Sequence, residues 1–248
     1  MVTSMHPPEP LMRRLRQLSG MESGQRRLVL LFPQLGDFDS LEYAQALVPV
    51  LPRIRAAGIK IAAIAIGDDR GAERFCQFTG FPREALSVDA VPHLHEALNL
   101  YQGLQTPGGA WPALLLMCAG VGSPGTLAEV LRGYVGDRSA PERIPATTTL
   151  RVGALPPISG SLFRWAGGTG YQRPFELALI RLRNMVEVLG HWSTYVPCAD
   201  FLVQRGGTYL IDADDRLLYC HRDPGLLGFS ASMSRPLAFL EPYLSQAA

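Results

Sequence analysis

The sequence contains few cysteines, and they form no recognisable motif. Cys76, Cys118, Cys198 and Cys220 lie far apart, without a CxxC pair and without histidines at the spacing of a zinc finger. The pattern indicates neither a dithiol motif nor a structural metal site, so we expect no metal and no cofactor. Because nothing here is typical of a disulfide framework, we also expect a reducing environment.

Targeting and membrane-spanning segments are missing as well. The N-terminal residues lack the basic and then apolar layout of a signal peptide. The longest nearly apolar run, residues 111–122, is well short of the about 20 residues that a membrane helix needs. We therefore expect a cytoplasmic, soluble protein, and peripheral contact with a membrane stays open.

Lysine is almost absent, because only Lys60 among the 23 basic residues is a lysine. Guanidinium forks suit carboxylates and phosphates, but a compositional bias of the source genome explains the excess of arginine at least as well. The net charge of +1 gives no reason to expect a nucleic-acid partner. The 248 residues suffice for one large domain, or for one domain with a substantial elaboration.

A strand, a loop and a helix are predicted in residues 27–58. The apolar run 28–32 reads as a buried strand, and a loop rich in Gly, Asp and Ser leads to a helical pattern that starts near Ser40. Ser40 or Asp39 could cap this helix. In an open α/β sheet, chemistry occurs in such a loop. The loop contains Asp37 but no Cys, His or Lys.

The following segments continue this α/β pattern. Pro49 and Pro52 interrupt the helix, so we expect it to be kinked or split in two. Residues 59–67 are apolar on both faces, as a central parallel strand must be, and complete a right-handed crossover unit. A helix over about 70–79 and a short strand over 85–89 follow.

A further helix is predicted from Val91. His93 and His95 fall on different faces of it, so they are expected to be ordinary surface histidines rather than joint metal ligands.

Residues 102–204 differ in composition and are rich in Gly, Pro, Arg and aromatic residues. We predict a buried helix over 111–121, a second helix over 125–135 and mainly irregular structure over 136–170. An amphipathic helix then ends at Gly190. Its apolar face comprises Phe175, Leu179, Leu182, Val186 and Leu189.

The two ends of the chain are predicted to be an arm and a hairpin. Residues 1–26 form an arm whose short helix lies on its own domain, although a membrane or partner anchor is an alternative. Residues 208–211 and 216–221 are predicted to form a hairpin around an Asp-rich turn. We interpret these aspartates as ordinary turn-forming residues rather than as a calcium site. A closing helix is expected over 233–244.

Three pieces of the sequence resemble one known family. They are L-V-L-L-F-P-Q-L-G-D-F-D-S-L-E-Y-A, G-I-K-I-A-A-I-A-I-G and G-G-T-Y-L-I-D-A-D-D-R-L-L-Y-C-H-R-D. Together they are similar to peroxiredoxin-like proteins of the AhpC/TSA superfamily. The resemblance implies a thioredoxin-like α/β three-layer sandwich, a central mixed sheet flanked by helices, over residues 27–104 and 205–248. Residues 105–204 would be a large, mostly helical and irregular insertion packed on it.

The same resemblance bears on the loop. In active relatives a Gly-Cys-x-x-Cys motif precedes the helix, because the helix N-terminus stabilises a thiolate. Matching Gly36 and residues 42–44 to that motif places Asp37 and Ser40 at the two cysteine positions. The alternative motif Pro-x-x-x-Thr-x-x-Cys, counted from Pro33, has Asp37 and Ser40 in place of Thr and Cys. Neither side chain can perform peroxidatic chemistry.

The leading hypothesis is therefore a non-catalytic relative that acts as a binding, assembly or regulatory factor for a protein partner. Relatives with similar loops look like those of photosynthetic organisms, so a photosynthetic complex at a thylakoid-type membrane is a plausible partner. We expect the binding surface to combine the loop with the insertion. The candidate residues are Gln34, Asp37, Ser40, Arg205, Arg164, Trp165 and Tyr171.

Two alternatives remain. Cys198 lies in a polar, loop-like stretch and could serve an atypical thiol-dependent antioxidant oxidoreductase, with Arg205 nearby to favour its thiolate. The other three thiols are less suited, because they fall in apolar runs or on a strand. The second alternative is an anion site at residues 34–40, where backbone N–H groups, Ser40 and Arg205 would hold the ligand.

Overall fold

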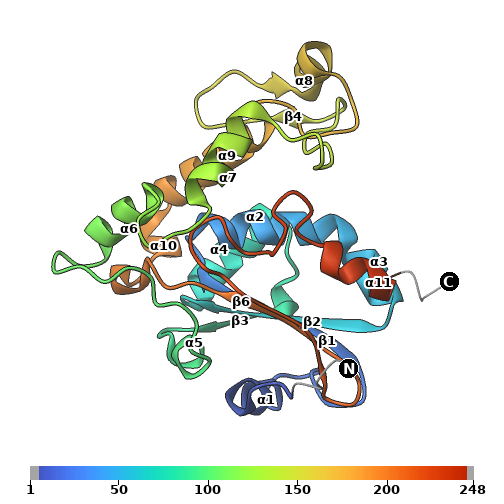
Figure 1. The fold of residues 1–248 in the computed structure, drawn as a ribbon, viewed down its shortest axis with the longest axis vertical. Coiled ribbons are helices and arrows are strands. Elements are labelled where there is room, and N and C mark those ends of the chain that lie inside the picture. Colours follow the sequence, from blue (N-terminus) through green and yellow to red (C-terminus); the bar gives the residue numbers. More distant parts are fainter. Residues whose placement is uncertain (1–5, 245–248) are drawn as a thin grey trace.

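A mixed five-stranded sheet forms the centre of the computed structural model, which describes residues 6–244 (Figure 1). The strands are β1 (Arg26–Gln34), β2 (Ile59–Ile66), β3 (Leu86–Asp89), β6 (Gly207–Ile211) and β7 (Leu217–Arg222), in the order β3-β2-β1-β6-β7. β1, β2 and β3 are parallel, whereas β6 is antiparallel to β1 and to β7. The predicted strands and hairpin are confirmed.

Helices cover both faces of the sheet. One face carries α2 (Phe38–Leu47), the 3-10 helix η1 (Val48–Val50), α3 (Leu51–Ala56), α4 (Asp69–Thr79), η4 (Ala238–Leu240) and α11 (Glu241–Leu244). The other carries α1 (Glu9–Leu15) and α5 (His93–Ala97) (Figure 1). A short 3-10 helix, η2 (Arg83–Ala85), leads into β3. This arrangement confirms the predicted thioredoxin-like α/β class.

β1 is buried almost throughout, because its two faces belong to two separate cores. Leu30 and Phe32 pack against α2 and α4 in one core, and Val29 and Leu31 pack against α1 in the other. Leu11 of α1 is fully buried there, so the arm does lie on its own domain, within the described part of residues 1–26.

The proline-rich helix is split as predicted. η1, which contains Pro49, separates α2 from α3, where Pro52 lies in the first turn. The closing helix is shorter than expected. Residues 233–237 form no helix, and only η4 and α11 follow before the described residues end at 244.

The segment between α5 and β6 is mainly helical. It comprises α6 (Ala110–Cys118), α7 (Thr126–Val135), β4 (Thr149–Leu150), β5 (Ile158–Ser159), α8 (Gly160–Gly167), α9 (Glu176–Gly190), α10 (Trp192–Tyr195) and the 3-10 helix η3 (Ala199–Phe201). α9 packs on α2, and α10 packs on α4. α6, α7 and α9 therefore lie over the end of the sheet at which β1 passes into α2 (Figure 1).

Polar pairs anchor this segment to the sheet domain. Arg181 of α9 donates to Glu42 of α2 at 2.7 Å, and Gln45 of α2 exchanges hydrogen bonds with Asn184. Arg74 of α4 forms a second ion pair with Glu187, at 2.6 Å. Because Glu42 is buried, its contact with Arg181 compensates a charge that water cannot reach.

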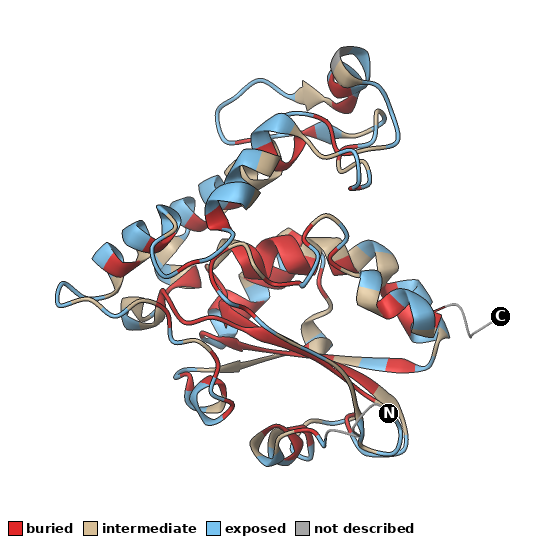
Figure 2. Cartoon of the chain, viewed as in Figure 1, coloured by how far each residue is buried: buried red, intermediate tan, exposed pale blue. Residues whose placement is uncertain are grey.

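Two predictions about the helices of this segment are wrong. α6 is not a buried helix, since Trp111 and Leu115 are exposed and only Ala113 and Met117 are covered. The apolar face predicted for α9 is not its buried face either. Its buried residues are Glu176, Leu177, Asn184 and Val188, because polar pairs rather than leucines hold α9 to α2. Figure 2 shows the exposed surface of this region.

His95 also differs from expectation. It is buried, and its Nε2 atom lies 2.9 Å from the carbonyl oxygen of Phe32, whereas His93 is exposed. Burial lowers the pKa of His95, so the neutral ring is favoured.

Candidate functional site

The loop after β1 ends in a helix cap. Asp37 is the N-cap of α2, and its Oδ1 atom accepts a hydrogen bond from the backbone N–H of Asp39 at 2.9 Å. Gly36 precedes it at a close approach, since a Cβ atom there would lie 2.6 Å from Cγ2 of Val196. The loop is therefore fixed by packing against Val196 and by the cap hydrogen bond. The capping residue is Asp37 instead of the predicted Asp39 or Ser40.

Arg205 is the buried cation of this site. Its side chain is fully covered and forms ion pairs with Asp37 and, at 3.4 Å, with Asp39. It also donates to the carbonyl oxygens of Val203 and Leu202. Burial opposes the charged form of Arg205, but the two carboxylates raise its pKa overall. The guanidinium therefore stays charged and is fully engaged with protein groups.

Asp39 and a third carboxyl group, Asp223, are buried close to the same guanidinium. Asp39 accepts hydrogen bonds from the backbone N–H of Leu227 on both oxygens, and Asp223 accepts one from Gly206. Burial raises the pKa of Asp39 well above its usual range, with a further contribution from Asp37. Burial likewise raises the pKa of Asp223 to about 8. Both shifts favour the protonated carboxyl.

Four predicted residues come together here. Ser40 donates from Oγ to the carbonyl oxygen of Gln34 at 3.1 Å, and Gln34 donates from Nε2 to the carbonyl oxygen of Cys198. Both side chains are buried beside Asp37 and Arg205. The anion site stays a prediction that these contacts do not favour, because Asp37 and Asp39 already pair with the Arg205 guanidinium and the Ser40 hydroxyl donates within the loop.

The other three predicted residues lie elsewhere. Arg164 and Trp165 are on α8, at the end of the insertion far from the sheet (Figure 1). Trp165 is 89% exposed, so it packs on almost nothing. Tyr171 lies under the guanidinium of Arg138, with 5.6 Å between the Arg138 Cζ atom and the ring centre. The structure therefore does not join these residues to the loop.

No thiol lies between β1 and α2. Cys76 is in the core, where burial raises its pKa to about 11. Burial also raises the pKa of Cys118 and of Cys220. Cys198 is half-buried, and its Sγ atom lies 3.7 Å from a carboxylate oxygen of Asp200. Arg205 pairs with Asp37 and Asp39 instead, and a catalytic role of Cys198 stays a prediction.

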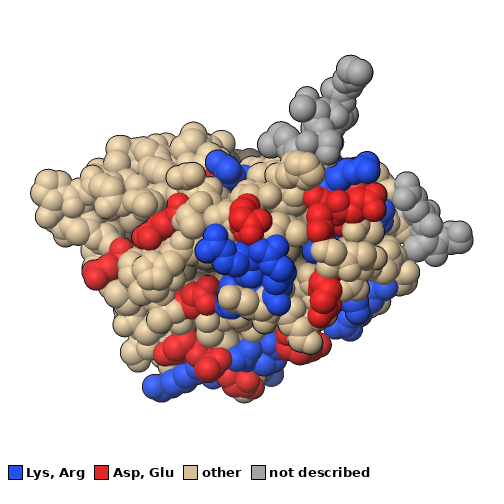
Figure 3. Space-filling model, turned by 90° about the horizontal axis from the view of Figure 1, so that it is seen from below, with Lys and Arg blue, Asp and Glu red and all other residues tan. Residues whose placement is uncertain are grey.

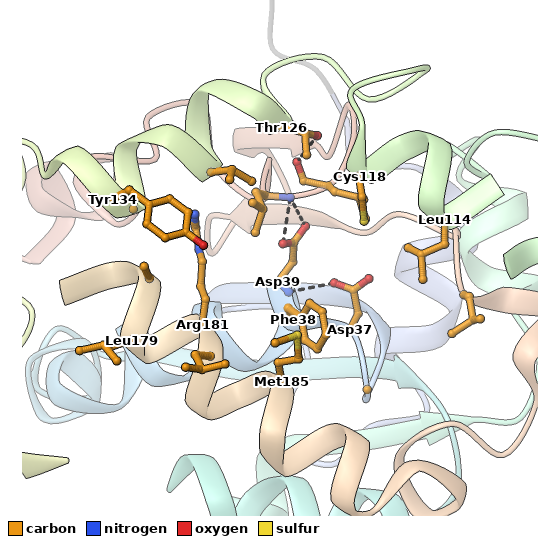
Figure 4. A pocket seen from close by; sticks show the side chains of 18 of the residues that line it. Asp37, Phe38, Asp39, Leu114, Cys118, Thr126, Tyr134, Leu179, Arg181 and Met185 are labelled. Atoms are coloured by element: carbon orange, nitrogen blue, oxygen red, sulfur yellow. Dashed lines mark hydrogen bonds between the residues drawn. The ribbon is translucent and has the colours of Figure 1, made fainter. Parts of the chain in front are cut away.

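A cavity lies directly beside the loop, with a volume of about 460 Å³. We call it the insertion cavity, because α6, α7, α9 and α10 of the insertion form its walls, and Asp37, Phe38 and Asp39 line it from the loop. Figure 4 shows Asp37 and Asp39 between Tyr134 and Leu114. Sequence reasoning missed it, although the apolar face predicted for α9 was its signal: Phe175, Leu179 and Leu182 line it.

Two features were searched for in residues 6–244 and not found. No group of three or more His, Cys, Asp or Glu side chains in this range is arranged to hold a metal ion. None of the helices described there combines the length and apolarity required to cross a membrane.

Comparison with known protein families gives one match. Residues 46–225 match the model of the AhpC/TSA antioxidant enzyme family, and the match begins after the loop at residues 34–40. Searches of curated proteins and of solved structures found no match. The family model spans well over half of the 248 residues, and together with the observed fold it shows that the chain belongs to the AhpC/TSA family.

Proposed function

We propose that this chain is a non-catalytic member of its family that acts as a binding, assembly or regulatory protein. The observation that carries the proposal is the buried ion pair of Asp37 with Arg205, at the position that the sequence resemblance assigns to the nucleophile. Peroxide reduction in that family needs a sulfur that can be oxidised and then reduced again. A carboxylate cannot do this, and Asp37 is already used as a helix cap and as a counter-ion.

The insertion provides the surface for a partner. Of the 17 large hydrophobic residues exposed in the described chain, 16 belong to residues 105–204. On α7, Leu127, Leu131 and Val135 follow one another at intervals of four residues and form one exposed stripe. Leu115 on the neighbouring helix α6 is 67% exposed. Exposed apolar surface of this extent is typical of interaction sites.

Charge is distributed differently over the molecule. Figure 3 shows acidic and basic side chains interleaved over the face that carries α1. Fewer charged side chains are visible at the end of the same view where α6 lies, which Figure 1 locates. We therefore propose a partner whose own contact surface is apolar and uncharged. The proposed partner is a protein. Binding to a membrane surface instead would contradict the proposal.

The binding proposal is tested by substituting two exposed leucines. Leu115→Glu with Leu131→Glu places one charge on α6 and one on the stripe of α7, without touching the core. Val91→Glu, at an exposed position outside the insertion, is the matched control. A protein that co-purifies with the wild type and with Val91→Glu should be lost from the double variant. Equal recovery from all three, or recovery of lipid vesicles instead of a protein, would contradict the proposal.

The second candidate function is a thiol-dependent oxidoreductase. It is favoured by the hydrogen bond from Gln34 to the carbonyl oxygen of Cys198, because this bond holds the Cys198 backbone next to the loop. Peroxide consumption with a thiol donor separates the two functions. Under the leading proposal the wild type consumes no more peroxide than Cys198→Ser, whereas clear turnover that Cys198→Ser abolishes would establish the second function.

A further inference from the structure

The insertion cavity is lined by distant parts of the chain. Its walls come from α6, α7, α9 and α10, and its floor comes from the loop after β1 and from residues 226–227. In Figure 4, Tyr134 and Leu179 lie toward one end and Leu114 and Cys118 toward the other, with Asp39 between them. A molecule that contacts both groups of residues must reach across the loop, so an elongated molecule suits this lining.

Apolar side chains dominate the walls. Leu114, Val130, Leu179, Met185 and Trp192 all line the cavity. Protein interiors are normally close-packed, and side chains around an unfilled space lose the dispersion contacts that a filling molecule would restore. The volume of about 460 Å³ falls within the range of small-molecule sites.

The Arg181 and Thr126 side chains at the walls already form hydrogen bonds within the protein. Arg181 donates from Nε to Glu42 at 2.7 Å, from Nη1 to the carbonyl oxygen of Glu129 at 2.7 Å, and from Nη2 to the Glu129 carboxylate at 3.3 Å. Thr126 donates to the carbonyl oxygen of Leu226 at 3.0 Å. Every nitrogen of Arg181 therefore already donates to a protein group, and two carboxylates compensate its charge.

The floor disfavours an anion for a further reason. Asp37 and Asp39 line it, and Arg205, the cation that forms ion pairs with both, does not itself line the cavity. A fatty-acid carboxylate in the cavity would meet two carboxyl groups and no available cation. A cation would compete with Arg205 and lose its hydration among leucines.

We propose that the insertion cavity binds a neutral, elongated, lipid-like molecule whose hydrocarbon chain contacts Val130, Leu179 and Met185. This inference goes beyond the binding of a protein partner and does not depend on it. The exposed residues assigned to the partner, Leu115 and Leu131, do not line the cavity.

The first test uses the neutral fluorescent probe N-phenyl-1-naphthylamine. It should bind the full-length protein with increased fluorescence that saturates. Val130→Trp places an indole in the cavity and should weaken binding at least about tenfold. Leu131→Trp, the next residue on α7 and 60% exposed, adds the same side chain outside the cavity and should bind like the wild type. Equal affinities of the two variants would overturn the proposal.

The second test addresses ligand charge. Dodecanol and dodecanoate have the same chain length, so their ability to displace the probe compares a neutral head with an anionic one. Dodecanol should displace it at concentrations at least about tenfold lower. Equal displacement by dodecanoate, or displacement by neither, would overturn the proposal.

A second pair of variants covers the case in which Val130→Trp fails to fold. Met185→Glu introduces charge into the cavity, whereas Val186→Glu introduces it at an adjacent exposed residue that does not line the cavity. Circular dichroism first confirms that both variants fold. The probe affinity should then fall for Met185→Glu alone, and equal affinities would count against the proposed site.

Discussion

Asp223 should make the stability of the protein fall as pH rises. This carboxyl group is buried, and its Oδ2 atom accepts one hydrogen bond, from the N–H of Gly206 at 3.1 Å. Its Oδ1 atom has no hydrogen-bond partner in the described chain, with the nearest His221 nitrogen 3.8 Å away. Burial therefore raises the pKa to about 8, whereas an unfolded chain has a pKa of about 3.9 at an aspartate.

The sign follows from proton counts. Between these two pKa values the folded protein holds a proton that the unfolded chain has released, so unfolding becomes easier as pH rises. The slope is about 1.4 kcal/mol per pH unit at most, or about 2.7 kcal/mol between pH 5 and pH 7. This contribution is complete below the unfolded pKa and is lost as pH rises through the folded pKa.

Asp223→Asn isolates the effect. Asparagine keeps an acceptor for the N–H of Gly206 and does not titrate. Urea unfolding from pH 5 to pH 8 should show the free energy of unfolding of the variant rising relative to wild type by up to about 2.7 kcal/mol between pH 5 and pH 7. Asp214→Asn, the same substitution in the exposed hairpin turn, is the matched control. A difference between Asp223→Asn and the wild type that stays constant over this pH range would refute the reasoning.

Three further predictions concern the rest of the site. Arg181→Met leaves buried Glu42 without its cation and should lower the free energy of unfolding by about 3 kcal/mol in urea titrations. Adding Glu42→Met to this variant should recover much of the lost stability. No recovery would contradict an electrostatic cause. Gly206→Ala places Cβ 2.0 Å from the carbonyl oxygen of Leu31 and should lower the melting temperature strongly, whereas Gly190→Ala, with open space, should leave it unchanged or raise it. Cys76 should resist a thiol reagent in the native protein at neutral pH and react after unfolding, because burial raises its pKa; mass spectrometry of labelled peptides measures this, and rapid native labelling would refute it.

The sheet domain was predictable because its signals are local. Pro49 and Pro52 act through the backbone at their own positions, and they split the helix as the sequence indicates. The apolar runs of β1 and β2 are buried on both faces, so their strand assignment needs no knowledge of distant residues. Helix capping is local too, and a cap was expected in this loop, but the capping residue is Asp37 instead of Asp39 or Ser40.

The insertion was less predictable because its contacts are not local. Periodicity predicts that leucines hold α9 to the domain, but Asn184 and Glu187 do so through Gln45 and Arg74. Partners so far apart in sequence leave no spacing that can be read from the chain. The apolar face of α9 was correctly recognised as apolar, but it borders the insertion cavity and solvent instead of a core.

The charges around Arg205 link the loop to the cavity. One guanidinium faces Asp37, Asp39 and Asp223, and three ionised carboxylates would leave a net negative charge away from water. The raised pKa values of Asp39 and Asp223 relieve this charge, because protonation of both leaves Asp37 and Arg205 as a neutral pair. Protonation of these carboxyl groups brings the charge around Arg205 closer to zero. A loop with this balance offers no nucleophile but suits an uncharged ligand, and ionisation of Asp223 above about pH 8 should disfavour an anionic ligand further.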